Sequence, residues 1–137
     1  MFRMRREYLK GTNPLSRNKR LKCLFEINEV NRVADFGVNE MQKMQKELQE
    51  KYKDKWEPID AERGKNKLLW MIGEIGEVID IVKKNGGNKA STDEFLRKDL
   101  IEEMADVLMY YNDVMLCYGI TTDELKQAYI KKFERNM

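Results

Sequence analysis

Apolar side chains in residues 38–137 recur every three or four positions, a period that predicts amphipathic helices. Four such runs are separated by short breaks that contain Gly, Pro, Asn or Asp, and we expect helices at about 39–52, 60–84, 91–118 and 121–136. No run shows the alternation of β-branched residues that is typical of a strand. The pattern therefore predicts an all-α fold, a four-helix bundle.

Local signals predict where these helices begin and end. A Ser, Thr or Asn followed three residues later by Glu or Gln can cap the first turn of a helix. Three such capping boxes are expected, and they are Asn39 with Gln42, Ser91 with Glu94, and Thr121 with Glu124. The second helix is expected to end at Gly86 and Gly87, because glycine readily adopts the backbone conformation that closes a helix. In the first helix the expected core stripe is Met41, Met44, Gln45 and Leu48.

Residues 1–37 differ from the rest of the chain in both pattern and charge. Residues 1–20 have no helical period, and residues 21–36 have a weak one that predicts a short helix. Residues 1–37 carry nine Lys and Arg against four Asp and Glu, whereas residues 38–137 carry seventeen against twenty. We interpret 1–37 as a basic N-terminal extension, loosely structured or short-helical, next to a domain at 38–137. Nucleic-acid binding is not expected, because the extension has no recognised motif or aromatic platform.

The composition excludes several classes of enzyme. The chain has no histidine, which excludes Ser/His and Cys/His nucleophilic sites and di-iron bundles built on Glu-x-x-His. Its two cysteines, Cys23 and Cys117, lie in unrelated segments, so they do not form a zinc site and they fit a reducing compartment. No run approaches the roughly 18 apolar residues of a membrane span. We expect a cytoplasmic protein with no membrane contact, whose chemistry depends on carboxylates, Lys, Tyr, metal and water.

Two pairs of carboxylates interrupt the second and third predicted helices, which are otherwise the most apolar. The pairs are Glu74 with Glu77 and Glu103 with Asp106. A spacing of three residues places both members of a pair on one helix face. If the two helices pack antiparallel, all four carboxylates converge, and their repulsion then requires a cation. Oxygen ligands favour Mg²⁺, with Mn²⁺ as the alternative, and such ions support chemistry on phosphates. A solvated acidic face is the competing interpretation.

Neighbouring positions suggest further roles. Tyr110 follows Asp106 by one turn on the same face, so it is a candidate for contact with phosphate or sugar. Trp70 is a candidate for stacking on a base, although both aromatic residues also fit an ordinary core. The second and third helices are apolar on more than one face, which indicates that one face is covered by a second subunit. We therefore expect a homodimer or homotetramer.

The paired motifs resemble those of the MazG-like all-α nucleoside triphosphate pyrophosphohydrolases. The signature of that family is Glu-x-x-Glu on one helix and Glu-x-x-Asp on the next, and both parts are present here. The stretch from Glu102 to Leu108 and the closing stretch from Lys132 to Asn136 are also similar to the family pattern. Trp56-Glu57-Pro58 fits its dUTPase/dCTPase-like branch. One position departs, since many relatives carry Glu where this chain has Gly73.

The resemblance implies a MazG-type four-helix bundle that cleaves nucleoside triphosphates to monophosphate and pyrophosphate. The substrates that it implies are deoxynucleotides, and the role is sanitation of the nucleotide pool. It implies Mg²⁺ ligation by the four paired carboxylates, with Glu74 or Glu77 as the base through a bridging water. It also implies substrate contacts from the last helix, at Lys132 and Asn136. Two alternatives stay open, which are a phosphoribosyl-ATP pyrophosphohydrolase-like enzyme and a non-catalytic helical dimer that binds nucleotide or metal.

Overall fold

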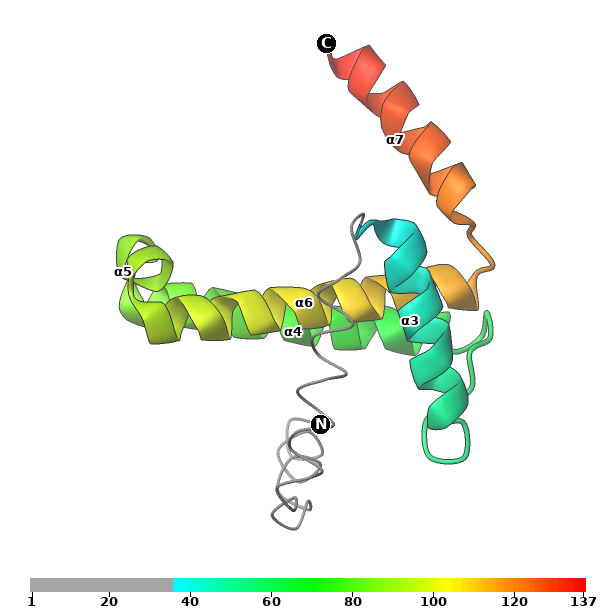
Figure 1. Ribbon diagram of the computed structural model, residues 1–137, viewed down its shortest axis with the longest axis horizontal. Helices are drawn as coiled ribbons and strands as arrows, with labels where there is room; N and C mark the ends of the chain where they lie inside the picture. Colours follow the sequence, from blue (N-terminus) through cyan, green and yellow to red (C-terminus); the bar gives the residue numbers. More distant parts are fainter. Residues whose placement is uncertain (1–35) are drawn as a thin grey trace. The chain divides into compact units, whose positions relative to one another are not determined.

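The computed structural model describes residues 36–137, and every regular element in this range is a helix. The helices are α3 (Val38–Lys51), α4 (Gly64–Asn85), α5 (Gly87–Thr92), α6 (Glu94–Cys117) and α7 (Thr122–Asn136) (Figure 1). The predicted all-α class is confirmed, and the four predicted helices correspond to α3, α4, α6 and α7. Helix α5, a short helix between α4 and α6, was not predicted as a separate element.

The chain divides into two units, Met1–Phe36 and Gly37–Met137. The predicted basic extension and its short helix fall almost entirely outside the described residues, so their structure and their separation from the domain at 38–137 stay predictions. None of the helices among residues 36–137 is long and apolar enough to cross a membrane.

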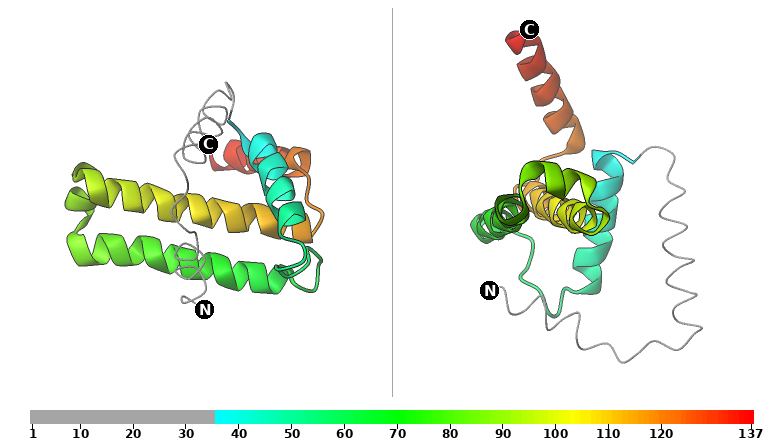
Figure 2. Two further views of the ribbon diagram at one scale, coloured as in Figure 1. Left: turned by 60° about the horizontal axis from the view of Figure 1, so that its bottom comes forward. Right: turned by 90° about the vertical axis from the view of Figure 1, so that its left-hand side faces the viewer.

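Helices α4 and α6 form the central element of the second unit. They are 22 and 24 residues long, and they lie side by side and antiparallel (Figure 2, left). Gly86, with a φ of 81°, ends α4 as predicted, and α5 then carries the chain across to the start of α6. Helix α3 packs against α6 near the other end of the pair (Figure 1). The long antiparallel contact fixes which side chains of α4 and α6 face one another.

The cap of α6 is Asp93 rather than Ser91. One carboxylate oxygen of Asp93 accepts hydrogen bonds from the main-chain N–H groups of Phe95 and Leu96, both at 3.1 Å. Ser91 lies within α5, and its hydroxyl donates to the main-chain oxygen of Asn88 at 2.8 Å. The predicted box of Ser91 with Glu94 is therefore wrong, because Ser91 is already used inside the preceding helix.

The start of α3 also differs from the prediction. The helix begins at Val38 without a side-chain cap. Asn39 instead accepts a hydrogen bond from the hydroxyl of Thr122, and Gln42 points into the protein toward Asn112. Both members of the predicted Asn39–Gln42 box are thus engaged with residues far away in the sequence, which local sequence analysis does not detect.

Of the two remaining predicted helix starts, that of α4 is wrong and that of α7 is confirmed. Helix α4 begins at Gly64, later than predicted, because Asp60 closes a separate turn by accepting the main-chain N–H of Arg63 at 3.0 Å. The capping box that opens α7 is present as predicted, with Thr121 and Glu124 bonded to each other's main-chain N–H groups at 2.8 and 3.2 Å.

The buried face of α3 is polar rather than apolar. Its buried residues are Gln42, Gln45 and Gln49. Of the predicted core stripe, Gln45 is buried and Met41 and Leu48 are half-buried, whereas Met44 is 41% exposed. Helix α3 is therefore attached to α6 mainly through hydrogen bonds, and the predicted apolar stripe is only partly correct.

We expect Asp93→Ala to lower the free energy of unfolding by about 1 kcal/mol, because replacing a helix N-cap with Ala costs about 0.5–2 kcal/mol. Ser91→Ala is the matched control and should change it by less than about 0.5 kcal/mol. Urea unfolding followed by circular dichroism measures both values. Equal losses in the two variants would contradict the assignment of Asp93 as the cap.

Candidate functional site

Three carboxylates converge where the middle of α4 lies against α6. Glu74 comes from α4, and Glu103 and Asp106 come from successive turns of α6. Each contributes a carboxylate oxygen that lies within 4.8 Å of the other two. Glu74 is buried, and the two α6 carboxylates are half-buried. The structure thus brings together three of the four carboxylates that the sequence predicts as metal ligands.

This acidic cluster has the chemistry of a site for a hard divalent cation. All three groups offer carboxylate oxygens, which Mg²⁺ and Mn²⁺ prefer. Around an octahedral Mg²⁺ ion with bonds of about 2.0–2.1 Å, ligand oxygens are about 3–4 Å apart. The oxygens of the cluster, within 4.8 Å of one another, need only a small adjustment to reach that geometry. A cation there would also offset the repulsion between three like charges.

The fourth predicted ligand, Glu77, lies about one turn beyond Glu74 on α4 and is half-buried. It is not part of the three-carboxylate group, so its role as a ligand stays a prediction. Gly73 precedes Glu74, and a Cβ built on Gly73 would meet no atom within 4 Å in the described part of the chain. Close packing therefore does not require glycine at this position.

The two aromatic residues proposed to contact substrate lie together, next to the acidic cluster. The rings of Trp70 and Tyr110 are stacked, with centroids 6.1 Å apart and an angle of 13° between their planes. Trp70 precedes Glu74 by one turn, and Tyr110 follows Asp106 by one turn. Both rings are half-buried. The stacked pair therefore lies between α4 and α6, one turn along each helix from a clustered carboxylate.

The residues predicted to bind substrate from the last helix occupy a different position. Lys132 and Asn136 lie on α7, which has no buried residue. Figure 1 and the right-hand view of Figure 2 show α7 extending away from α4 and α6. Within a single chain the structure therefore does not bring Lys132 or Asn136 to the acidic cluster, and their role stays a prediction.

A buried carboxylate near the end of α6, to which the sequence assigned no separate role, joins three helices. Asp113 of α6 is 3% exposed. It accepts hydrogen bonds from the side-chain amide of Gln45 at 2.8 Å and from that of Gln49 at 2.8 and 2.9 Å, both on α3. The ammonium of Lys67, from α4, lies 3.5 Å from Oδ2 of the same carboxylate. Asp113 therefore links α3, α4 and α6 at one point.

The preceding residue on α6, Asn112, extends this polar contact. The side-chain amide of Gln42 donates to Asn112 Oδ1 at 2.8 Å and to its main-chain oxygen at 3.2 Å. Asn112 in turn donates to the main-chain oxygen of Leu108 at 2.8 Å. A signal for this network was present in the sequence, since three glutamines recur at positions 42, 45 and 49 on one face of α3. The apolar period predicts an apolar stripe there, and the structure shows that the buried residues are these glutamines instead.

Burial raises the pKa of the Asp113 carboxyl above its ordinary value, and this is the largest influence on it. The amide of Gln45, the charge of Lys67 and the amide of Gln49 act in the opposite direction, because each favours the ionised form. Burial also raises the pKa of the Cys117 thiol, one turn further along α6, which disfavours a reactive thiolate. Both groups are structural parts of the helix contact.

Comparison with known proteins identifies one family. The sequence model of the MazG nucleotide pyrophosphohydrolase domain matches residues 63–136, which include all of α4 to α7. No curated protein and no solved structure matches the chain significantly. The matched range contains the acidic cluster, the stacked aromatic pair and both predicted α7 residues.

The raised pKa of Asp113 predicts a dependence of stability on pH. Between the ordinary value of 3.8 and the raised value, the folded protein keeps this proton while the unfolded chain releases it. The contribution of Asp113 to the free energy of unfolding is therefore fully present below 3.8 and is lost as pH rises through that window. Asp113→Asn should remove this component, as measured by urea unfolding of both proteins across the acidic range.

Asp80→Asn is the control, because the pKa of Asp80 is shifted in the opposite direction. A hydrogen bond from Lys84 lowers the pKa of the Asp80 carboxyl, so its small contribution is present above the ordinary value and is lost as pH falls. If the stability of Asp113→Asn follows the same pH profile as the wild type, the burial argument for Asp113 is wrong.

Proposed function

The chain belongs to the MazG nucleotide pyrophosphohydrolase family, and from this we propose that it hydrolyses nucleoside triphosphates between the α- and β-phosphates with Mg²⁺ as the cofactor. The products would be a nucleoside monophosphate and pyrophosphate. The observation that carries the proposal is the group of three carboxylates within 4.8 Å of one another, inside the matched range. Oxygen ligands of this kind hold the cation that phosphate chemistry requires.

We assign Glu74, Glu103 and Asp106 as ligands of the cation, with Glu77 as the fourth. When bound, Mg²⁺ (or Mn²⁺) supplies Lewis acidity, neutralises phosphate charge and lowers the pKa of a coordinated water. Glu74 or Glu77 acts as the general base, accepting a proton from the attacking water. Cleavage then breaks the bond between the α-phosphorus and the bridging oxygen, and that oxygen leaves with pyrophosphate.

Substrate contacts are assigned around this centre. The base or sugar is assigned to the stack of Trp70 and Tyr110, since that stack lies beside the carboxylates. Lys132 and Asn136 are assigned to the phosphates, for which the Lys ammonium and the Asn side-chain amide are suitable donors. By the family resemblance, deoxynucleotides such as dUTP, dCTP or a damaged nucleotide are the expected substrates. The expected biological role is sanitation of the cytoplasmic nucleotide pool.

Assembly into a homodimer or homotetramer is part of the proposal. Helices α4 and α6 expose large apolar side chains, and these include Leu69, Ile72, Ile79, Ile101, Met104 and Leu108, each 46–61% exposed. Helix α7 exposes Tyr129 and Phe133 at 75% and 58%. Monomeric soluble proteins rarely expose large contiguous apolar surface. A second copy of the chain supplies an apolar surface of the same kind, so we expect these faces to pair between subunits.

We expect Asp106→Ala or Glu77→Ala to reduce Mg²⁺-dependent pyrophosphate release about 100-fold or more, because the cation supplies several kcal/mol of transition-state stabilisation. The helical circular dichroism spectrum should be unchanged. Pyrophosphate release is measured on a panel of nucleoside triphosphates and on phosphoribosyl-ATP, with and without Mg²⁺. Near-normal activity of either variant would refute the ligand set.

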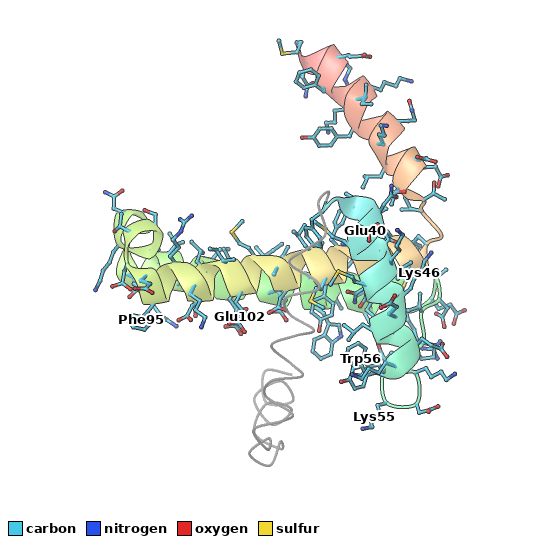
Figure 3. The ribbon with its side chains drawn as sticks, viewed as in Figure 1. Glu40, Lys46, Lys55, Trp56, Phe95 and Glu102 are labelled. Atoms are coloured by element: carbon cyan, nitrogen blue, oxygen red, sulfur yellow. The ribbon has the colours of Figure 1, made fainter. Side chains whose placement is uncertain are left out.

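Glu102→Ala is the matched control for these variants. Glu102 is adjacent to Glu103 but about 100° away around the helix, and it is exposed (Figure 3). The activity of this variant should stay within about twofold of the wild type, since Glu102 has no part in the proposed centre.

The wild-type protein tests the alternatives. Preference for phosphoribosyl-ATP would change the substrate assignment, and binding of nucleotide without turnover would contradict the enzymatic proposal.

Sedimentation should show a dimer or larger assembly at micromolar concentration. Ile72→Glu is expected to weaken that assembly by about tenfold or more, because Ile72 is 61% exposed and a buried unpaired charge costs several kcal/mol. Ile72→Met, which keeps an apolar side chain of similar size, is the control and should assemble normally. A wild-type protein that is monomeric at all concentrations tested would contradict the prediction.

A further inference from the structure

Helices α4 and α6 meet through three successive pairs of polar and aromatic residues. Lys67 faces Asp113 at 3.5 Å, Trp70 stacks on Tyr110 at 6.1 Å, and Glu74 lies in one acidic cluster with Asp106. We call these six residues the α4–α6 seam. From one pair to the next, the position advances by three and then four residues on α4 and goes back by three and then four on α6. The pairs therefore share a single antiparallel register.

The apolar residues of these helices do little to select that register. Many of their large apolar side chains are exposed, and apolar contact is not directional. Displacing one helix by a single turn would move Glu74 about 5 Å along α6, away from its carboxylate partners. A device that specifies the register is therefore required for the acidic cluster to form, and buried polar groups are the best-documented devices of this kind.

The first seam pair has the properties of such a device. The side chains of Lys67 and Asp113 are 8% and 4% exposed, so neither charge can be satisfied by water if the helices slide. Asp113 is also fixed in place from α3, by Gln45 and Gln49. Lys67 is seven residues from Glu74, about 10 Å along the helix, so it is too far along α4 to coordinate a cation bound at the cluster.

We propose that the Lys67–Asp113 ion pair is a positioning element for the metal centre: it sets the register of α4 against α6, and thereby brings Glu74 to Glu103 and Asp106. Helix α3 takes part through the two glutamines that hold Asp113. The inference rests on the proposed metal site, and it assigns to residues outside that site the task of assembling it.

The direct test is the affinity of the full-length chain for Mn²⁺ alone, measured by electron paramagnetic resonance or calorimetry. Lys67→Met separates positioning from simple electrostatics, because the two predict opposite signs. Removal of a positive charge near an acidic site should strengthen cation binding if only charge matters. Loss of the register should weaken it instead, and we expect a 10- to 100-fold weaker affinity, as is typical when groups that orient metal ligands are lost.

Three further variants distinguish an effect of the helix register on Mn²⁺ affinity from effects of charge and of overall stability. Lys84→Met removes the same charge from the same helix at an exposed pair with Asp80, and should leave the affinity unchanged or slightly stronger. Met115→Ala opens a cavity at a residue that is 2% exposed, so it should lower the melting temperature without changing the affinity of the folded protein. The double variant Lys67→Met/Asp113→Asn should lose no more affinity than the weaker-binding single variant, because the two residues act as a unit.

The possible outcomes separate this inference from the proposed function. A wild-type chain that does not bind Mn²⁺ would refute the metal centre, and with it the basis of the inference. A wild type that binds, together with a folded Lys67→Met variant of equal or stronger affinity, would overturn the positioning role alone. If Lys67→Met does not fold, Lys67→Gln replaces it as the neutral variant, and wild-type affinity in that protein overturns the inference equally.

Discussion

The fold of residues 37–137 depends on the burial of charge between α4 and α6. This contact buries a lysine and two carboxylates, Lys67, Glu74 and Asp113, whereas many of the large apolar residues of the same helices are exposed. A buried charge is tolerated only where its partners are correctly placed. The polar contacts therefore constrain the geometry of the helix pair more tightly than apolar packing does, and the acidic cluster is one result of that constraint.

Helix α3 contributes to the same constraint although it holds none of the clustered carboxylates. Its three buried glutamines donate to Asn112 and Asp113, and they present amide donors where an amphipathic helix usually presents leucines. Amide hydrogen bonds are directional, so they orient α3 on α6 and also limit the freedom of the Asp113 carboxylate. Without α3, Lys67 would be the remaining described partner of that carboxylate.

The sequence predicted what depends on local spacing and failed where distant residues compete for the same group. Helices α4, α6 and α7 follow from their apolar period, and the Thr121 cap follows from its own box. Asn39 and Ser91 had the correct residue types, but both side chains are bonded elsewhere. Three of the predicted ligands meet because the spacing of three held on α6 and the helices pack antiparallel. Lys67 and Asp113 are 46 positions apart in the sequence, and their helices are neighbours only in the folded protein. The period of apolar residues along the chain therefore does not reveal this ion pair.

Gly73 has a consequence for how the charge of this centre can change. Glycine within a helix lowers the stability of that helix by about 0.5–1 kcal/mol relative to alanine. A Cβ built on Gly73 meets no atom within 4 Å in the described chain, so no close approach requires glycine here. A longer side chain there would project into open space, one turn before Glu77. The number of carboxylates beside the acidic cluster is thus free of steric constraint at this point. A carboxylate introduced there would therefore add negative charge beside the acidic cluster without disturbing the contact between α4 and α6.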